Sequence, residues 1–170
     1  MLARSGPIPT GRGWLFEPKL DGFRCLTCTH GGRFRARSRR GWNMTKLLPE
    51  LGEALPPNVQ LDGEVVAIGA DGMPDFHRLG SRLLRGHAGI AVMYFVFDVL
   101  AVEGLPAMGR SYSERRTLLE ELDVERPGVV QLVATFEDGE ALFQPSLNAA
   151  WRVSSRSASA TRTGPTSAAG

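Results

Sequence analysis

Residues 17–24, EPKLDGFR, hold two acids, a lysine, an arginine and a proline around a single leucine. A lysine amine attacks an electrophile only when neutral, and partial desolvation or nearby cations favour the neutral form. Arg24 and the arginines of residues 33–40 could supply such cations, and Asp21-Gly22 favours a tight turn. The pattern predicts Lys19 as a nucleophile, and the alternative is a surface lysine on an exposed hairpin.

Two further polar stretches could bind parts of an anionic ligand. LDGE at 61–64 places Glu64 where it could bind a ribose hydroxyl or a hard metal ion. SRRG at 38–41 places Arg39 where it could grip a phosphate. The alternatives are a charged turn in the first case and the end of a basic hairpin in the second.

The aromatic run YFVFDVL at 94–100 offers a surface for a purine. Phe97 or Phe95 could stack on a base, since every base has a π-face. Taken alone, an aromatic in a core strand explains the run equally well. Residues 91–102 are a continuous apolar run with one acid, which is typical of a buried central strand.

The elements that must position these residues follow from hydrophobic periodicity and turn signals. We expect strands at 14–30 (two runs around the Lys-Leu-Asp-Gly turn), 33–38, 59–68 (broken at Asp62-Gly63), 91–102 and 129–138. We expect helices at 44–55 (interrupted by Pro49), 76–86 and 111–123 (capped by Ser111 or Ser113). Residues 137–143 could open another helix. A Gly31-Gly32 turn predicts a hairpin whose second strand, 33–38, carries arginines on one face. The fold class is α+β with antiparallel hairpins.

The net charge of +2 conceals an uneven distribution along the chain. Residues 1–48 hold ten Lys/Arg against two Asp/Glu, residues 49–144 hold seven against sixteen, and residues 145–170 hold three against none. A basic first third suggests a phosphate-rich partner such as nucleic acid or a nucleotide, or else a solvated face balanced by the acidic middle. The sequence shows no apolar run that predicts a membrane span and no signal peptide. Two cysteines, Cys25 and Cys28, fit a reducing cytoplasm, and we read both as structural or surface residues.

In this order, EPKLDGFR, SRRG, LDGEVVA and YFVFDVL resemble the nucleotidyltransferase motifs of ATP-dependent DNA ligases, in particular bacterial ligases associated with end-joining repair. The resemblance covers about residues 1–143. It implies an ATP-grasp-like nucleotidyltransferase domain, the ligase adenylation domain, built of antiparallel sheets flanked by helices. It also implies ATP and Mg²⁺ as cofactors and nicked or broken duplex DNA as partner, with end-joining repair proteins as further possible partners of a cytoplasmic monomer.

The resemblance implies a role for each matching residue. Lys19 would attack the α-phosphate of ATP, release pyrophosphate and become lysyl-AMP. The AMP would pass to a 5′-phosphate at a DNA nick, from which a 3′-hydroxyl displaces it. Glu17 would contact the adenine amino group, and Phe97 would stack on the adenine ring. Arg24 and Glu64 would hold the ribose, and Glu64 could also bind Mg²⁺. Arg39 would contact the AMP phosphate and the DNA.

The family pattern continues with EGxVxK and WxKxK segments and an OB-fold domain, and none of these follows residue 143 in this sequence. Residues 145–170 are instead rich in Ser, Ala, Thr and Arg, which predicts disorder. Residues 150–158 can be encoded by GC-rich codons that also contain a second reading frame. When the same bases are read from the third base of codon 150, they encode Leu-Glu-Gly-Val-Val-Ala-Lys-Arg, which matches EGxVxK. We therefore expect a partial adenylation domain at 1–144 and an out-of-frame tail at 145–170. Such a chain would bind ATP weakly and would not seal nicks.

Two other functions remain open on the sequence. RNA ligases and GTP-using capping enzymes share the Lys-x-Asp-Gly nucleophile. A non-catalytic fragment could also bind DNA through the basic hairpin at 33–40. Competition between ATP and GTP for Lys19, and DNA binding that survives loss of Lys19, distinguish these alternatives.

Overall fold

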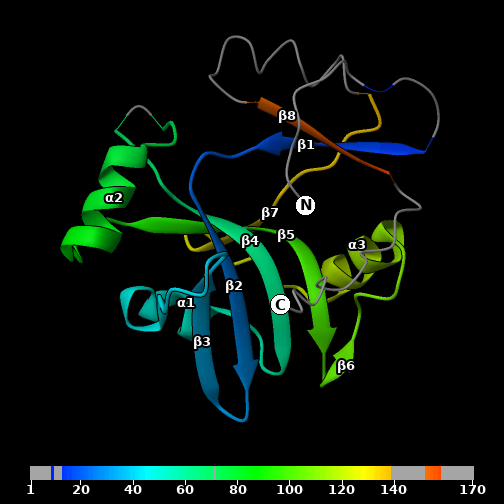
Figure 1. The fold of residues 1–170 in the computed structure, drawn as a ribbon, viewed down its shortest axis with the longest axis horizontal. Helices are drawn as coiled ribbons and strands as arrows, with labels where there is room; N and C mark the ends of the chain where they lie inside the picture. Colours follow the sequence, from blue (N-terminus) through cyan, green and yellow to red (C-terminus); the bar gives the residue numbers. More distant parts are fainter. Residues whose placement is uncertain (1–8, 10–12, 71, 139–151, 158–170) are drawn as a thin grey trace, which may run out of the picture.

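The central feature of the fold is a six-stranded sheet in which four strands have the order β3-β2-β4-β5, with β6 beyond β5 (Figure 1). The computed structural model describes residue 9, residues 13–70 and 72–138, and the backbone of 152–157. The elements are β1 (Trp14–Lys19), β2 (Phe23–His30), β3 (Arg33–Ser38), the 3-10 helix η1 (Thr45–Leu47), α1 (Pro49–Ala54), β4 (Val59–Ala67), α2 (Phe76–Arg85), β5 (Val92–Val102), β6 (Leu105–Pro106), α3 (Tyr112–Glu121), β7 (Val130–Leu132) and β8 (Arg152–Ser157). The predicted α+β class is confirmed.

The strands of this sheet pair antiparallel, as predicted, with one exception. The short strand β7 runs parallel to β5, and the strand expected at 129–138 is reduced to its first part. Of the helix considered for 137–143, residues 139–143 lie outside the described residues. No helix of the described residues is both long enough and apolar enough to span a bilayer.

Strand β4 is continuous, and the predicted break at Asp62-Gly63 was wrong. The strand runs through both residues, and its register with β5 shifts between them. A Cβ on Gly63 would lie 2.5 Å from the ring of Tyr94. The glycine is therefore there to let the Tyr94 ring approach the backbone, and it introduces a bulge in place of a turn.

The helices cover one face of the sheet and enclose the main core. Leu51 of α1, Leu79 and Leu83 of α2 and Leu119 of α3 are buried there against Cys25, Ala36, Leu61, Val65, Tyr94, Val96 and Val99 of the sheet. The helix ends follow the expected chemistry, because Asp75 caps α2 and Ser111 forms a capping box with Glu114 at the start of α3.

The opposite face of the sheet is covered at one end only. There β1, together with β8 and the segment at Phe136, forms a second layer, visible at the top of Figure 1. A second core joins the layers through Leu20, Val66 and Val133, with Ile68, Phe95 and Phe97 packed against them. The remainder of this face carries the polar residues described below.

Strand β8 lies within residues 145–170, the segment for which the composition predicts disorder. Its backbone pairs antiparallel with β1 over six residues, from Trp14↔Ser157 to Lys19↔Arg152. The edge of β1 offers unpaired backbone groups that an extended segment satisfies. The remaining residues of this segment lie outside the described residues.

Candidate active site

The predicted nucleophile, Lys19, ends β1 and opens the loop that leads into β2. Its Nζ donates to Oδ1 of Asp21 at 2.7 Å, and its side chain is 33% exposed. The loop is tied to β4, because the N–H of Gly22 donates to Oε1 of Glu64 at 3.1 Å. A Cβ at Gly22 would lie 2.1 Å from the carbonyl oxygen of Val65, so only glycine lets the loop approach β4 this closely.

Arg24 lies on β2 between a buried carboxylate and an aromatic ring. Its Nε and Nη2 donate to the two oxygens of Asp62 at 2.9 and 2.6 Å, and Asp62 is 1% exposed. The guanidinium carbon lies 5.4 Å from the centre of the Phe97 ring. The hydrogen bonds to Asp62 raise the pKa of Arg24 further, and burial opposes this effect. Asp62 therefore fixes Arg24 as a cation above the predicted stacking residue.

Glu64 stands beside Arg24, since the two are paired across β2 and β4. Burial raises the pKa of Glu64 to about 7, while the Gly22 N–H and the charges of Lys19 and Arg24 act in the opposite direction. Lys19, Arg24 and Glu64 therefore form one electrostatic cluster, and Arg24 connects it to Phe97. The sequence predicted these four residues from three separate segments, and the structure brings them together.

Glu17 lies two residues before Lys19 on β1 and is 2% exposed. The hydroxyl of Tyr112, at the start of α3, donates to its Oε1 at 2.5 Å. Helix α3 is itself held to β5 by Arg115, which makes two hydrogen bonds to the buried Asp98. Sequence reasoning missed Tyr112 because nothing in the chain signals a contact between residues so far apart. The sequence did place Tyr112 in the first turn of a predicted helix, but this position does not indicate a contact with Glu17.

Arg39 is exposed in the turn that follows β3. The register pairs Ser38 with Cys25, so Arg39 follows β3 at the end of β2 that carries Arg24. No ion pair joins Arg39 to another residue within the described part of the chain. Its contact with AMP phosphate stays a prediction.

Glu64 is the carboxylate of this site for which the sequence suggests a role as Mg²⁺ ligand. Residues 13–70 and 72–138 contain no group of three or more His, Cys, Asp or Glu side chains arranged around a metal. Both oxygens of Asp62 accept hydrogen bonds from Arg24, and Oδ1 of Asp21 accepts one from Lys19. One carboxylate such as Glu64 fits Mg²⁺ when substrate phosphates and water complete the octahedron.

Comparison with known proteins places this site in a family. The family model described as the ATP dependent DNA ligase domain matches residues 5–142. The SPbeta prophage-derived DNA ligase-like protein LigB of Bacillus subtilis is 29% identical over 131 residues, which are 76% of this chain and 48% of that protein.

The multifunctional non-homologous end joining DNA repair protein LigD of Mycobacterium tuberculosis is 34% identical over 128 residues, 72% of this chain and 16% of that protein. A solved structure of mycobacterial DNA ligase D complexed with ATP and MES has a TM-score of 0.72 and 29% identity, covering 88% of this chain and 50% of that one. The chain thus spans half or less of these relatives. It belongs to the family of ATP-dependent DNA ligase domains.

Proposed function

We propose that this chain carries the adenylylation site of an ATP-dependent DNA ligase, with Lys19 as the nucleophile. The observation that supports it most is the cluster of Lys19, Arg24 and Glu64, held on one sheet face beside Phe97. The relatives' names supply ATP and DNA as the substrates to test. We further propose DNA breaks as the target, in the cytoplasm, with end-joining proteins as partners.

In the proposed step the Lys19 amine, after losing a proton, attacks the α-phosphorus of ATP. The nitrogen–phosphorus bond forms, the bond from the α-phosphorus to the bridging oxygen breaks, and pyrophosphate leaves. The nitrogen then loses a second proton. Asp21 Oδ1 lies 2.7 Å from Nζ and is the nearest group that could take a proton. The Gly22–Glu64 hydrogen bond keeps the loop, and with it the amine, in place.

The remaining site residues would hold the nucleotide. The base would stack on Phe97 and donate its amino group to Glu17, while Arg24 and Glu64 would bind the ribose. Arg39 would contact the AMP phosphate and the DNA. Mg²⁺, when bound by Glu64 and the phosphates, would reduce the negative charge of the triphosphate.

The chain contains its own control for the nucleophile, because its two lysines are Lys19 and Lys46. Lys46 is exposed in η1. We would incubate the protein with ATP radiolabelled at the α-phosphate and Mg²⁺, and compare the unmodified chain with K19R and K46R. We expect labelling of the unmodified chain and of K46R, and none of K19R.

Three results would count against the proposal. Equal labelling of K19R and the unmodified chain would remove Lys19 from the chemistry. Stronger suppression of labelling by GTP than by the same concentration of unlabelled ATP would favour a capping-type enzyme. Transfer of the label to nicked RNA in preference to nicked DNA would favour a ligase of the RNA type.

A further inference from the structure

The hairpin β2–β3 carries a basic surface on the same sheet face as Lys19 and Glu64. We call Arg33, Arg35 and Arg37 of β3, with His30 of β2, the arginine face. All four residues are exposed. The register pairs His30 with Arg33, Cys28 with Arg35 and Leu26 with Arg37, and paired residues of neighbouring strands point to the same side of a sheet.

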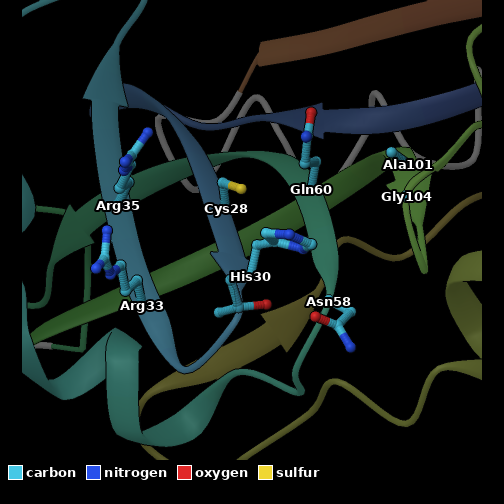
Figure 2. Close-up of a pocket in the computed structure, with 9 residues that line it drawn as sticks. Cys28, His30, Arg33, Arg35, Asn58, Gln60, Ala101 and Gly104 are labelled. Carbon is cyan, nitrogen blue, oxygen red and sulfur yellow. The ribbon is translucent and has the colours of Figure 1, made fainter.

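A concavity of about 330 Å³ adjoins the arginine face. Figure 2 shows Arg33 and Arg35 along one side, with Cys28 and His30 next to them and Gln60 across from them. All of its nine lining residues are basic, neutral polar or small, and none is a carboxylate. The hollow therefore presents hydrogen-bond donors and positive charge, and suits an anion.

The charge of the arginine face is not neutralised by the protein. Within the described residues, no carboxylate forms an ion pair with Arg33, Arg35 or Arg37. Arg37 donates to the carbonyl of Gly41 at 3.2 Å. By contrast, the arginines that serve the fold, such as Arg115, are paired with buried acids. Exposed unpaired arginines in a row favour an external polyanion over a structural role.

The arginine face and the Lys19 site are two ends of one surface. Along β2, Arg24 and His30 lie on the same side, about 20 Å apart at the usual rise per strand residue. Beyond Glu64, the surface is closed by the core around Leu20 and Val133. A ligand lying on the open end would therefore extend toward Lys19.

We propose that the arginine face binds the phosphodiester backbone of duplex DNA and directs it toward the nucleotide on Lys19. This inference rests on the proposed function, since it assigns the DNA a place beside the adenylylation site. Arg33 to Arg37 span about 13 Å of strand, and a duplex strand presents about four phosphates over that length of helix axis. Three guanidinium groups can thus face phosphates of one strand, and the hollow can admit a further phosphate oxygen.

The test compares two triple variants with the same change in charge. R33Q/R35Q/R37Q neutralises the arginine face, and R78Q/R85Q/R110Q neutralises three exposed arginines elsewhere. Binding of a fluorescent nicked duplex would be measured by anisotropy between 50 and 200 mM salt. Each phosphate contact contributes about 0.9 to the slope of log K against log salt. We expect the arginine-face variant to lose about 3 from this slope, and the control to lose less than about 1.

The outcomes separate this inference from the proposed function. Equal losses in the two variants, or binding by the unmodified chain that does not depend on salt, would overturn the DNA site. Labelling of Lys19 in the unmodified chain without DNA tests the proposed function alone, and its failure does not bear on the salt dependence of DNA binding. Urea unfolding checks that each variant folds. If a triple variant does not fold, the single variants R35Q and R85Q repeat the comparison.

Discussion

The hydroxyl of Tyr112 donates a hydrogen bond of 2.5 Å to Oε1 of Glu17, although 95 residues separate them. Both side chains are buried. A buried carboxylate held by a charge-assisted hydrogen bond keeps one orientation. In the proposed site, a carboxylate fixed in this way would accept the amino group of adenine and repel the carbonyl oxygen that guanine carries at the same place. The contact therefore links α3 to the choice of nucleotide.

Removing this hydroxyl should weaken the discrimination between ATP and GTP. We expect Y112F to reduce the ratio of ATP to GTP affinity by about tenfold, which corresponds to about 1.4 kcal/mol. Equilibrium dialysis with each nucleotide measures the ratio.

The second tyrosine of the chain, Tyr94, provides the control. Its buried hydroxyl donates to the carbonyl of Cys25 at 2.9 Å, within the core on the helix-covered side. Y94F should lower the free energy of unfolding without changing the nucleotide ratio. The same change of ratio in Y94F, or an unaltered ratio in Y112F, would show that Tyr112 acts only through stability.

The raised pKa of Glu64 predicts a pH-dependent stability. Its pKa is about 7 in the folded protein against 4.5 as the ordinary value, chiefly because of burial. The folded state therefore binds the proton more tightly than the unfolded state. The resulting stability is fully present below about pH 4.5 and is lost as the pH rises through 7. Between pH 5 and 8 this loss is about 2 kcal/mol, and E64Q should be free of it.

Urea unfolding of the unmodified chain, E64Q and E53Q at pH 5 and pH 8 measures this effect. Glu53 is an exposed residue of α1, so E53Q should follow the unmodified chain. An unmodified chain and an E64Q variant with the same pH dependence would mean that Glu64 is ionised in the folded protein throughout this range.

The bidentate pair of Arg24 and Asp62 predicts a coupled loss of stability and nucleotide binding. D62N would remove the acceptor that holds Arg24 over Phe97. We expect an unfolding free energy lower by about 2–3 kcal/mol, since Asp62 is buried and Arg24 is partly exposed. ATP affinity should fall as well, because Arg24 would no longer be fixed.

A matched change is available in the neighbouring pair. Asp98 lies opposite Asp62 in the sheet and holds Arg115 of α3. D98N should destabilise the protein at least as much, while ATP affinity measured on the folded fraction changes less. If D98N and D62N reduce affinity equally, Arg24 has no specific role in the nucleotide site.

The sequence was sufficient to predict the strands β1 and β2, the antiparallel β2–β3 hairpin, the central strand β5 and the helices α2 and α3, but not that β1 leaves the sheet of β2 and pairs with β8. These elements are marked by local signals such as Gly31-Gly32, the apolar run at 91–102 and the Ser111 cap. The β4 bulge was misread because Asp62-Gly63 has the composition of a turn, and the need for Gly63 comes from the ring of Tyr94 on another strand.

The candidate site was predicted in part for a similar reason. Three of the four motifs supplied Lys19, Arg24, Glu64 and Phe97, and the strand register brings these residues together. The contacts that fix them in place, Tyr112 to Glu17 and Asp62 to Arg24, depend on tertiary packing. Arg39 was predicted from the SRRG stretch, and the register sets it at the end of β3 nearest Arg24, where its role stays a prediction.

The alternative reading of residues 150–158 predicts a specific nucleotide sequence. We propose that the coding DNA, read from the third base of codon 150, contains Leu-Glu-Gly-Val-Val-Ala-Lys-Arg or a close variant. Strand β8 spans the same codons and pairs with β1, so a strand of the Gly-Val-Val type would suit this edge better than Ser-Ser. Sequencing codons 140–160 decides it, and the lack of any EGxVxK-like reading there would end the frameshift hypothesis.

The central claim is that the amine of Lys19 becomes covalently bound to AMP. Incubation with ATP and Mg²⁺, digestion and peptide mass spectrometry would locate the adduct, even when only a small fraction of the protein reacts. We expect AMP on the peptide that contains Lys19 and none on the peptide that contains Lys46. An adduct on Lys46, or on both lysines in similar amounts, would contradict it.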